Sequence, residues 1–359
     1  MSFLTEKNLN KSFLLKILDR EMSGNSFENK IILESIRENF EKNDFSLITP
    51  QEIQFINNNS PEILSDYLIF RYKFKNYPKY QIKSDIPQHL IIEPTSSCNL
   101  RCVFCYQLDD KFTKNFMGTM DIELFKKIID DAYSLGIRAV TLTGRGEPTI
   151  NPNIGEMLEY CKDKFFDLKM NTNATHLSEK LIHQILKSGV SDLVFSVDSY
   201  EKAEYESIRV RGIFENVLNN IKKFKEIKEN FYPESKCATR ISGVKINSTL
   251  DTETFKKFWE KYVDHVVLVE LQERWDTYHN PVENAGSGPC NYLWGEMNIW
   301  YDGTCNPCDV DYMSKLSVGN VRNKSIKEIW CGDKYENLRN LHKNGKRNTC
   351  HPCDRCSSW

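Results

Sequence analysis

Six short apolar runs, separated by stretches of helical periodicity, occupy residues 88–275 of this 359-residue chain. The runs cover residues 89–93, 139–143, 168–171, 193–197, 241–246 and 266–270. Between them apolar residues recur at helical spacing in 125–132, after a candidate N-cap at Asp121, and again in 181–186 and 217–224. Strands that alternate with helices pair in parallel through right-handed crossovers. We therefore expect an α/β fold, a partial (β/α)6 barrel similar to a TIM barrel, with its chemistry at the carboxyl ends of the strands.

The flanking segments differ from this pattern, and we expect three parts: residues 1–87, 88–280 and 281–359. Apolar periodicity in 13–18 and 31–36 predicts a mostly helical N-terminal extension, while 67–74 fits either a strand or a helix. Pro78 and Pro87 mark the border with the barrel. From about residue 285 the alternation stops and cysteines become frequent, which predicts a small module held together by metal.

Composition narrows the class of protein. The net charge of −2 gives no reason to expect nucleic acid as a partner, and no apolar stretch approaches the roughly 20 residues that span a bilayer. The first residues lack the basic start and apolar run of a secretion signal. Twelve cysteines in such a chain favour a reducing, cytoplasmic setting and metal ligation over a disulfide framework.

Three of these cysteines, Cys98, Cys102 and Cys105, follow the first expected strand. Structural zinc takes four ligands, so three closely spaced thiols fit such a site poorly. They suit a cubane iron–sulfur cluster with one iron left open for a substrate or cofactor. A zinc knuckle or a chance group of buried thiols is the alternative.

Polar residues follow the next strands at the same expected edge. Gly146 and Glu147 lie in the loop after the second strand, where glycine permits close backbone approach and a carboxylate accepts hydrogen bonds from an ammonium group. Asn173 follows the third strand, and Ser196 and Asp198 follow the fourth. Farther along, Arg209 and Arg211 could each pair with a carboxylate.

Together these motifs resemble the radical S-adenosylmethionine (SAM) superfamily. The cysteine motif of that family has an aromatic residue beside the last cysteine, and here Phe104 and Tyr106 lie on either side of Cys105. The resemblance implies that the three cysteines bind a [4Fe–4S] cluster that cleaves SAM reductively to a 5′-deoxyadenosyl radical. That family has Gly-Gly-Glu-Pro after the second strand, whereas this chain has Arg145 in place of the first glycine.

The resemblance also assigns roles to the residues that bind SAM. Tyr106, through its backbone, and Gly146 and Glu147 would hold the amino group, and Ser196 the ribose or carboxylate. Further cofactor contacts are expected from Asn173, Asp198 and Arg211. An electron donor such as flavodoxin or ferredoxin is implied as a partner.

The C-terminal segment carries a Gly-Asn pair at 319–320 and six cysteines, Cys290, Cys305, Cys308, Cys350, Cys353 and Cys356. These features resemble the SPASM extension of that superfamily, which holds auxiliary iron–sulfur clusters. Six thiols cannot complete two four-cysteine clusters, so we expect one auxiliary [4Fe–4S] cluster. The expected ligands are Cys290, Cys308, Cys353 and Cys356, with Cys305 and Cys350 as alternates. A zinc ribbon built on the two Cys-x2-Cys pairs is the competing interpretation. The remaining cysteines, Cys161, Cys237 and Cys331, are expected to be buried small hydrophobes.

For the substrate we favour a carbohydrate or other small molecule, oxidised or epimerised, because the cysteines supply one auxiliary cluster. Trp275, Asp276 and Tyr278 would then offer a surface for sugar hydroxyls at the barrel mouth, or merely a packed linker. Maturation of a peptide or protein is the alternative within the family. A non-catalytic, zinc-stabilised binding protein is the alternative from another class.

Overall fold

A computed structural model describes residues 10–21, 25–48, 50–246, 250–271, 277–278 and 285–357. The chain divides into two compact units, Met1–Ser84 and Asp85–Trp359.

The first unit is helical in the part that is described. Its helices are α1 (Lys11–Glu21), α2 (Phe27–Glu41), α3 (Pro50–Asn58) and α4 (Pro61–Tyr80). Ser26 caps α2 by accepting a hydrogen bond from the Asn29 backbone N–H, and Leu33, Ile36 and Phe40 of this helix are fully buried. Residues 67–74 lie within α4, so the strand interpretation of that segment is wrong.

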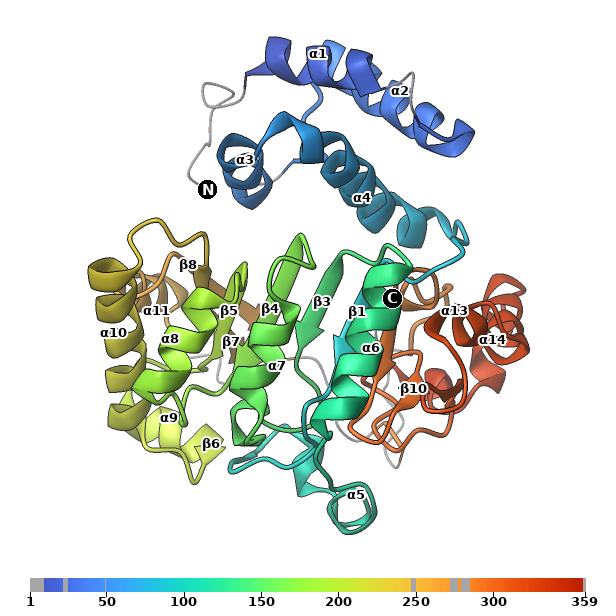
Figure 1. Ribbon diagram of the computed structural model, residues 1–359. Coiled ribbons are helices and arrows are strands. Elements are labelled where there is room, and N and C mark those ends of the chain that lie inside the picture. The colour runs from blue at the N-terminus through green and yellow to red at the C-terminus, as the bar shows by residue number, and fades with distance from the viewer. Residues whose placement is uncertain are drawn as a thin grey trace. The chain divides into compact units, whose positions relative to one another are not determined.

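The second unit is built on one sheet (Figure 1). Six of its strands pair in parallel in chain order: β1 (His89–Ile92), β3 (Ala139–Leu142), β4 (Asp167–Thr172), β5 (Asp192–Ser196), β7 (Ala238–Lys245) and β8 (His265–Glu270). They coincide with the six predicted runs, and the α/β fold with parallel strands is confirmed. The carboxyl ends of all six therefore meet at one edge.

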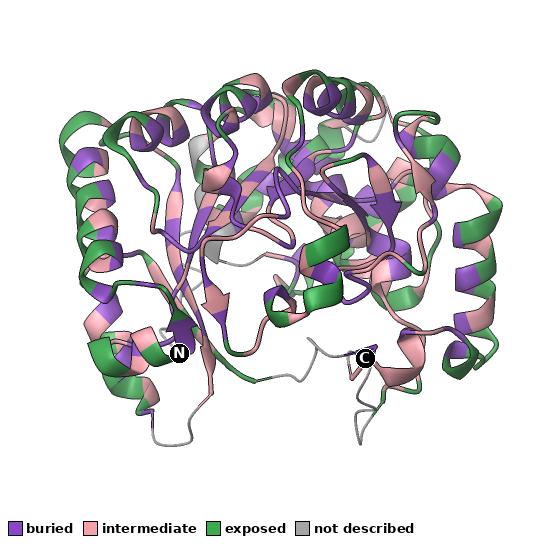
Figure 2. Ribbon diagram, turned by 90° about the horizontal axis from the view of Figure 1, so that it is seen from below, coloured by how far each residue is buried: buried purple, intermediate pink, exposed green. Residues whose placement is uncertain are grey.

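Helices cover one face of these strands. They are α6 (Ile122–Ser134), α7 (Ile154–Cys161), α8 (Glu179–Lys187), α10 (Phe214–Phe231) and α11 (Thr252–Trp259), with α5 (Asp110–Asn115) and α9 (Lys202–Ile208) beside the carboxyl edge. Asp121 caps α6 as predicted, accepting from the Leu124 N–H at 2.8 Å. Figure 2 shows the strands enclosed by helices that bury their inward sides and expose their outward ones.

The C-terminal segment continues this sheet instead of forming a separate layer. Strand β9 (Glu296–Ile299) pairs in parallel with β1, and β10 (Thr304–Asn306) and β11 (Gly319–Asn320) follow in antiparallel order. The accompanying helices are α12 (Tyr292–Gly295), α13 (Ile326–Trp330) and α14 (Asp333–Lys343). Because Trp294 and Trp330 are buried in the same apolar core as the barrel helices, this segment has more core than its cysteine content predicted.

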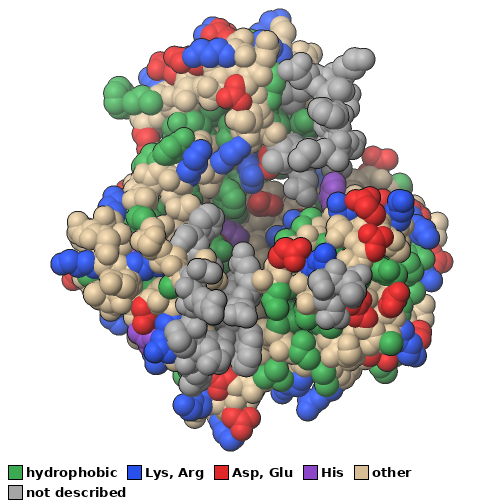
Figure 3. Space-filling view, turned by 180° about the vertical axis from the view of Figure 1, so that it is seen from behind, with side chains coloured by type: hydrophobic (Ala, Val, Ile, Leu, Met, Phe, Trp, Pro, Cys, Tyr) green, Lys and Arg blue, Asp and Glu red, His purple; other side chains and the backbone are tan. Residues whose placement is uncertain are grey.

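The surface carries no strong charge of one sign on the face shown in Figure 3, where acidic and basic side chains are interspersed. In the described part of the chain, no helix has the length and apolar character needed to cross a bilayer.

Candidate cluster and cofactor site

The three cysteines of the first motif lie together in the loop after β1. We call residues 98–105 the cysteine loop. Cys98, Cys102 and Cys105 are close enough to interact electrostatically. Burial raises the pKa of the Cys98 thiol to about 11 and that of the Cys105 thiol to about 12. The thiolate forms that ligate iron therefore need a strongly positive partner, which iron supplies.

A buried ion pair lies beside this loop. Strand β2 (Arg101–Cys102) pairs with β6 (Arg209–Val210), which places Arg209 opposite Cys102. The Arg209 Nε donates to Asp198 Oδ2 at 2.7 Å, and Asp198 Oδ1 accepts from the Val244 N–H at 2.8 Å. Burial alone would lower the pKa of the Arg209 guanidinium, but the adjacent Asp198 carboxylate raises this pKa above its usual value. Arg209 thus places a fixed positive charge next to a predicted cluster ligand.

Glu147 lies where the second motif predicts a carboxylate, buried and within electrostatic reach of Cys98. Its Oε1 accepts from Thr149 N and Oγ1 and from Thr172 Oγ1. Among the residues that the structure describes, its Oε2 accepts from one donor, the Asn173 N–H, at 2.7 Å. A carboxylate has about four acceptor positions, so Oε2 keeps one for a further donor such as an ammonium group.

Gly146 explains how the second loop reaches the first. A Cβ at this position would lie 2.3 Å from the Ser97 carbonyl oxygen and 2.5 Å from that of Thr95. The Glu147 N–H donates to the same Ser97 carbonyl at 2.8 Å. Glycine is therefore required for the two loops to touch.

The other predicted cofactor residues lie around this edge. Asn173 donates through Nδ2 to Asn99 Oδ1 at 3.0 Å, so it joins Glu147 to the cysteine loop. Ser196 is half-buried in the last position of β5. Both Asp198 oxygens are engaged by protein, and Arg211 is exposed, two residues beyond the buried Arg209. The cofactor contacts of all four side chains stay predictions.

Tyr106 and Gln107, which directly follow the cysteine loop, connect it to the loop after β3 and to Tyr312. The Tyr106 hydroxyl donates to the Gly144 carbonyl at 3.3 Å, and its ring stacks on Tyr312 with centroids 4.9 Å apart. Gln107 Nε2 donates to the carbonyls of Ser96, at 2.8 Å, and Arg145, at 2.6 Å.

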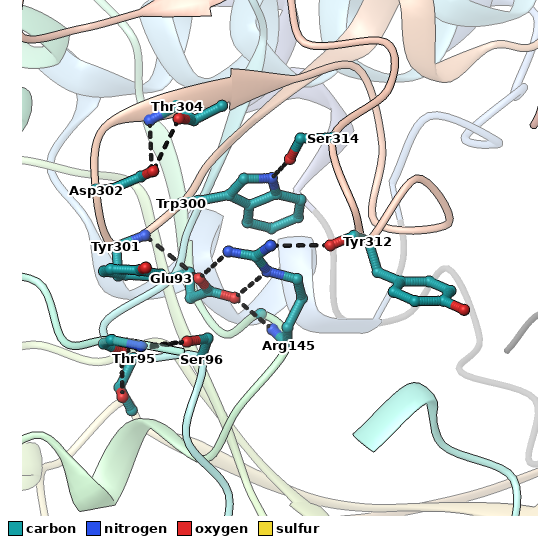
Figure 4. A network of polar contacts seen from close by, with 12 residues as sticks. Glu93, Thr95, Ser96, Arg145, Trp300, Tyr301, Asp302, Thr304, Tyr312 and Ser314 are labelled. Carbon is teal, nitrogen blue, oxygen red and sulfur yellow. Dashed lines mark hydrogen bonds and ion pairs between the residues drawn. The ribbon is translucent and has the colours of Figure 1, made fainter. Parts of the chain in front are cut away.

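Arg145, which replaces a glycine of the related motif, has a distinct role (Figure 4). Its guanidinium forms two bonds to the fully buried Glu93, Nε–Oε2 at 2.8 Å and NH2–Oε1 at 2.7 Å, and donates through NH1 to the Tyr312 carbonyl at 2.9 Å. The group lies over the Trp300 ring, 4.3 Å from its centroid. Burial alone would lower the pKa of the Arg145 guanidinium, but the Glu93 carboxylate raises this pKa above its usual value. This residue connects β1, the loop after β3 and the C-terminal segment.

Sequence reasoning missed this network. The available signals were an arginine next to a glutamate-containing motif and an acidic residue, Glu93, at the end of an otherwise apolar strand. Neither signal predicts that Tyr312 and Trp300, more than 150 residues farther along the chain, contact the Arg145 guanidinium.

A second cysteine group lines one cavity in the C-terminal segment. Its walls include the four preferred auxiliary ligands, Cys290, Cys308, Cys353 and Cys356, together with Arg347. Burial raises the pKa of Cys290 to about 12. The Arg347 guanidinium donates to the backbone carbonyls of Cys353, at 3.2 Å, and Cys356, at 3.0 Å. These two bonds hold the segment that carries both cysteines in place.

The other cysteines point elsewhere. Cys305 is fully buried in the core on β10, where its thiol contacts the Gly303 carbonyl, and the Cys350 thiol faces the Lys346 carbonyl. Cys161 and Cys237 are buried as predicted, whereas Cys331 is only half-buried.

One of the three residues predicted to form a surface for sugar hydroxyls, Tyr278, lies in the part of the chain that the structure describes. Trp275 and Asp276 lie outside the described residues. Tyr278 is buried, and its hydroxyl donates to the Asp311 carboxylate, which also caps the turn containing Lys315 and Leu316. The Tyr278 hydroxyl thus supports the C-terminal segment.

Comparison with known families agrees with this geometry. The family model described as the radical SAM superfamily matches residues 92–266, and that described as the SPASM iron–sulfur cluster-binding domain matches residues 290–357. This chain belongs to the radical SAM superfamily and carries a SPASM domain. It therefore binds a [4Fe–4S] cluster, SAM and an auxiliary cluster.

Two curated relatives of this radical SAM enzyme differ in what their names say they act on. A tungsten-containing aldehyde ferredoxin oxidoreductase cofactor-modifying protein of Pyrococcus furiosus is 24% identical over 312 residues, which are 74% of this chain and 87% of the relative. The antilisterial bacteriocin subtilosin biosynthesis protein AlbA of Bacillus subtilis is 26% identical over 282 residues, 68% of this chain and 60% of that protein.

Solved structures share the fold. Streptococcus suis SuiB bound to the precursor peptide SuiA matches with a TM-score of 0.58 at 17% identity, over 91% of this chain and 84% of that one. BtrN in complex with AdoMet and 2-DOIA matches with a TM-score of 0.53 at 18% identity, over 77% and 93%.

The residues present fit the implied groups. The cysteine loop offers three thiols, which leaves one iron of a [4Fe–4S] cluster open for SAM. Four cysteines line the cavity of the C-terminal segment, which matches the number of thiolates that a complete [4Fe–4S] cluster takes.

Proposed function

We propose that this radical SAM enzyme abstracts hydrogen from a polar small molecule, such as a carbohydrate, in an oxidation or epimerisation. When bound, the cluster and SAM supply the radical that removes the hydrogen atom. Within this proposal, Cys98, Cys102 and Cys105 ligate the cluster, Glu147 accepts from the SAM amino group, and Cys290, Cys308, Cys353 and Cys356 hold the auxiliary cluster.

The observation that carries the substrate class is the polar inner face of the sheet. Leu168 and Met170 of β4, Leu193 of β5 and Ile241 of β7 pack into the core beneath the helices. Successive strand residues point to opposite faces, so the intervening side chains face the interior of the barrel. The polar side chains of this set, which we call the inner face, lie beside the apolar Val194 and are Thr141, Lys169, Asn171, Asp192, Ser196, Arg240 and Ser242.

These side chains retain unused hydrogen-bonding capacity. Asp192 Oδ2 lies 3.7 Å from Lys169 Nζ and 3.4 Å from an Arg240 guanidinium nitrogen. The Asp192 Oδ1, Arg240 Nε and Asn171 Oδ1 atoms are buried without a hydrogen-bond partner among the described residues. Since leaving such groups unpaired costs about 1–3 kcal/mol each, a hydroxyl-rich ligand that satisfies them gains affinity.

A peptide substrate is the second candidate. The relative AlbA is named for bacteriocin biosynthesis, and SuiB is solved with a precursor peptide.

The test is deoxyadenosine formation by anaerobically reconstituted protein given SAM and dithionite. A panel of sugars, polyols and cyclitols is compared with synthetic peptides, each assayed for stimulation above background cleavage. Stimulation by a hydroxyl compound, with deuterium transfer from its labelled carbon into deoxyadenosine, supports the small-molecule proposal. Stimulation by peptides alone overturns it in favour of maturation.

Two substitutions connect the result to the inner face. Lys169→Met and Arg240→Met should weaken substrate stimulation while leaving background SAM cleavage unchanged, because neither residue is among those predicted to contact the cluster or SAM. Lys223→Met, at an exposed ion pair on α10, is the matched control and should change neither. Equal loss of stimulation in the control would refute the role of the inner face.

A further inference from the structure

A buried tyrosine hydroxyl lies unpaired on the helix that packs against the cysteine loop. Tyr205 of α9 is fully buried, and its hydroxyl has no hydrogen-bond partner among the residues that the structure describes. Native structures seldom leave such a group unpaired, because burial has removed its bonds to water. Where one occurs, it commonly serves a redox or catalytic site or binds a buried water or ion.

Backbone contacts fix α9 against the cysteine loop. The carbonyl of Ile208, the last residue of α9, accepts from the Val103 N–H at 3.0 Å. The chain then enters β6, in which Arg209 pairs with Cys102. Figure 1 shows α9 and β6 together at one end of the sheet. The helix that carries Tyr205 is therefore joined to the segment that carries the second cysteine of the motif.

The Tyr205 hydroxyl lies inside this junction. A Cβ at Gly212, whose N–H donates to the Arg209 carbonyl at 2.7 Å, would lie 3.1 Å from the hydroxyl oxygen. The hydroxyl is close enough to Arg209, Cys102 and Asp198 to interact with them electrostatically. Burial raises the pKa of the Tyr205 hydroxyl, so the group keeps its proton and can donate a hydrogen bond.

Cys102 differs from Cys98 in its surroundings. The Cys98 sulfur accepts from a backbone donor, the Leu100 N–H, at 3.5 Å. Cys102 instead has the Arg209 guanidinium opposite it, and Asp198 holds the Nε of that group at 2.7 Å. A fixed cation and a hydroxyl with a free proton thus lie beside the Cys102 sulfur.

Hydrogen bonds and positive charge near cysteine sulfurs favour the reduced, more negative state of an iron–sulfur cluster. We propose that the Tyr205 hydroxyl donates a hydrogen bond to the Cys102 sulfur when the cluster is bound. Together with the Arg209 charge, this bond raises the reduction potential of the cluster that cleaves SAM, so the cluster accepts its electron more readily. The inference rests on the proposed ligation of that cluster by Cys98, Cys102 and Cys105.

The test is the midpoint potential of each cluster in the complete, reconstituted Tyr205→Phe protein. The protein is titrated anaerobically with dithionite and followed by electron paramagnetic resonance. The signal that changes when SAM is added identifies the cluster of the cysteine loop. Reduction of this cluster should become less favourable by about three- to tenfold, which is a fall of about 30–60 mV for one electron. The auxiliary cluster is the internal control and should keep its potential.

Phenylalanine keeps the buried ring and deletes only the hydroxyl, so the variant should fold. A second measurement on the same samples is electron–nuclear double resonance of the reduced protein. It should detect an exchangeable proton coupled to the cluster of the cysteine loop in the parent, and Tyr205→Phe should lack this proton. Tyr232→Phe is the matched control, because its hydroxyl lies 2.8 Å from His183 Nδ1, directly after α10. This variant should leave both potentials unchanged.

The outcomes separate this inference from the proposed substrate class, since neither measurement uses a substrate. An unchanged potential and an unchanged proton coupling in Tyr205→Phe would overturn the proposal and assign the hydroxyl to a buried water. An equal shift of both clusters, or the same shift in Tyr232→Phe, would also overturn it. A parent protein without a signal that responds to SAM would refute the ligation by the cysteine loop and the inference with it.

Discussion

Removing the Arg145 guanidinium should destabilise the Asp85–Trp359 unit by about 3–5 kcal/mol, the usual cost of breaking a buried ion pair by deleting one partner. The residue is 3% exposed and Glu93 is 0% exposed, so water cannot replace the lost bonds. Arg145→Met deletes two bonds to Glu93, one to the Tyr312 carbonyl and the contact with the Trp300 ring.

The two partners should not be equally costly to remove. Without the guanidinium, Glu93 still accepts from the backbone N–H groups of Arg145, at 2.8 Å, and Tyr301, at 3.3 Å. Glu93→Gln instead leaves a buried cation facing a neutral amide. We therefore expect Glu93→Gln to cost at least as much as Arg145→Met, and the double variant to cost less than the sum of the two.

The assay is the thermal unfolding midpoint of reconstituted protein, measured anaerobically at one scan rate. At roughly 2–4 °C per kcal/mol for a domain of this size, each single variant should unfold about 10 °C earlier. The matched control is Arg138→Met, directly before β3, where the half-buried guanidinium donates to the backbone carbonyls of Tyr133 and Ile137. Single variants within about 2 °C of the parent, or strictly additive effects, would refute the reasoning.

Three further substitutions test the site. Gly146→Ala should abolish SAM binding, seen by equilibrium dialysis, since its Cβ would lie 2.3 Å from the carbonyl oxygen of Ser97, which directly precedes the cysteine loop. Gly288→Ala, at a position with open space, should not. Cys308→Ala should lose about four irons per chain by metal analysis, and Cys305→Ala none; equal losses would contradict the ligand assignment. Glu147→Gln should weaken SAM binding about 10- to 100-fold in the same dialysis, because a charge-assisted bond contributes about 1.5–3 kcal/mol; unchanged affinity would exclude its contact with the ammonium group.

The strands of the barrel were predictable because each is a short apolar run bounded by helical periodicity. Strand β9 was not, since four residues are too few to form a distinct pattern, and its partner β1 lies about 200 residues earlier. Only the folded chain shows that the C-terminal segment extends the barrel sheet.

In the site, too, local sequence predicted some features, and only the folded chain revealed others. Cysteine spacing predicted the cysteine loop, and the four preferred auxiliary cysteines do line one cavity. Local sequence could not reveal that Arg209 engages Asp198, or that Arg347 fastens the loops of Cys353 and Cys356. Such pairings depend on tertiary contacts between segments that have no local pattern in common.

The most direct test of the central claim joins metal analysis to product detection in the Cys98→Ala/Cys102→Ala/Cys105→Ala variant. The parent should hold about eight irons and form deoxyadenosine from SAM and dithionite, since each [4Fe–4S] cluster contributes four irons. The variant should keep about four irons, in the C-terminal cavity, and form no deoxyadenosine. Deoxyadenosine formation by the variant, or zinc in place of iron in the parent, would contradict the account.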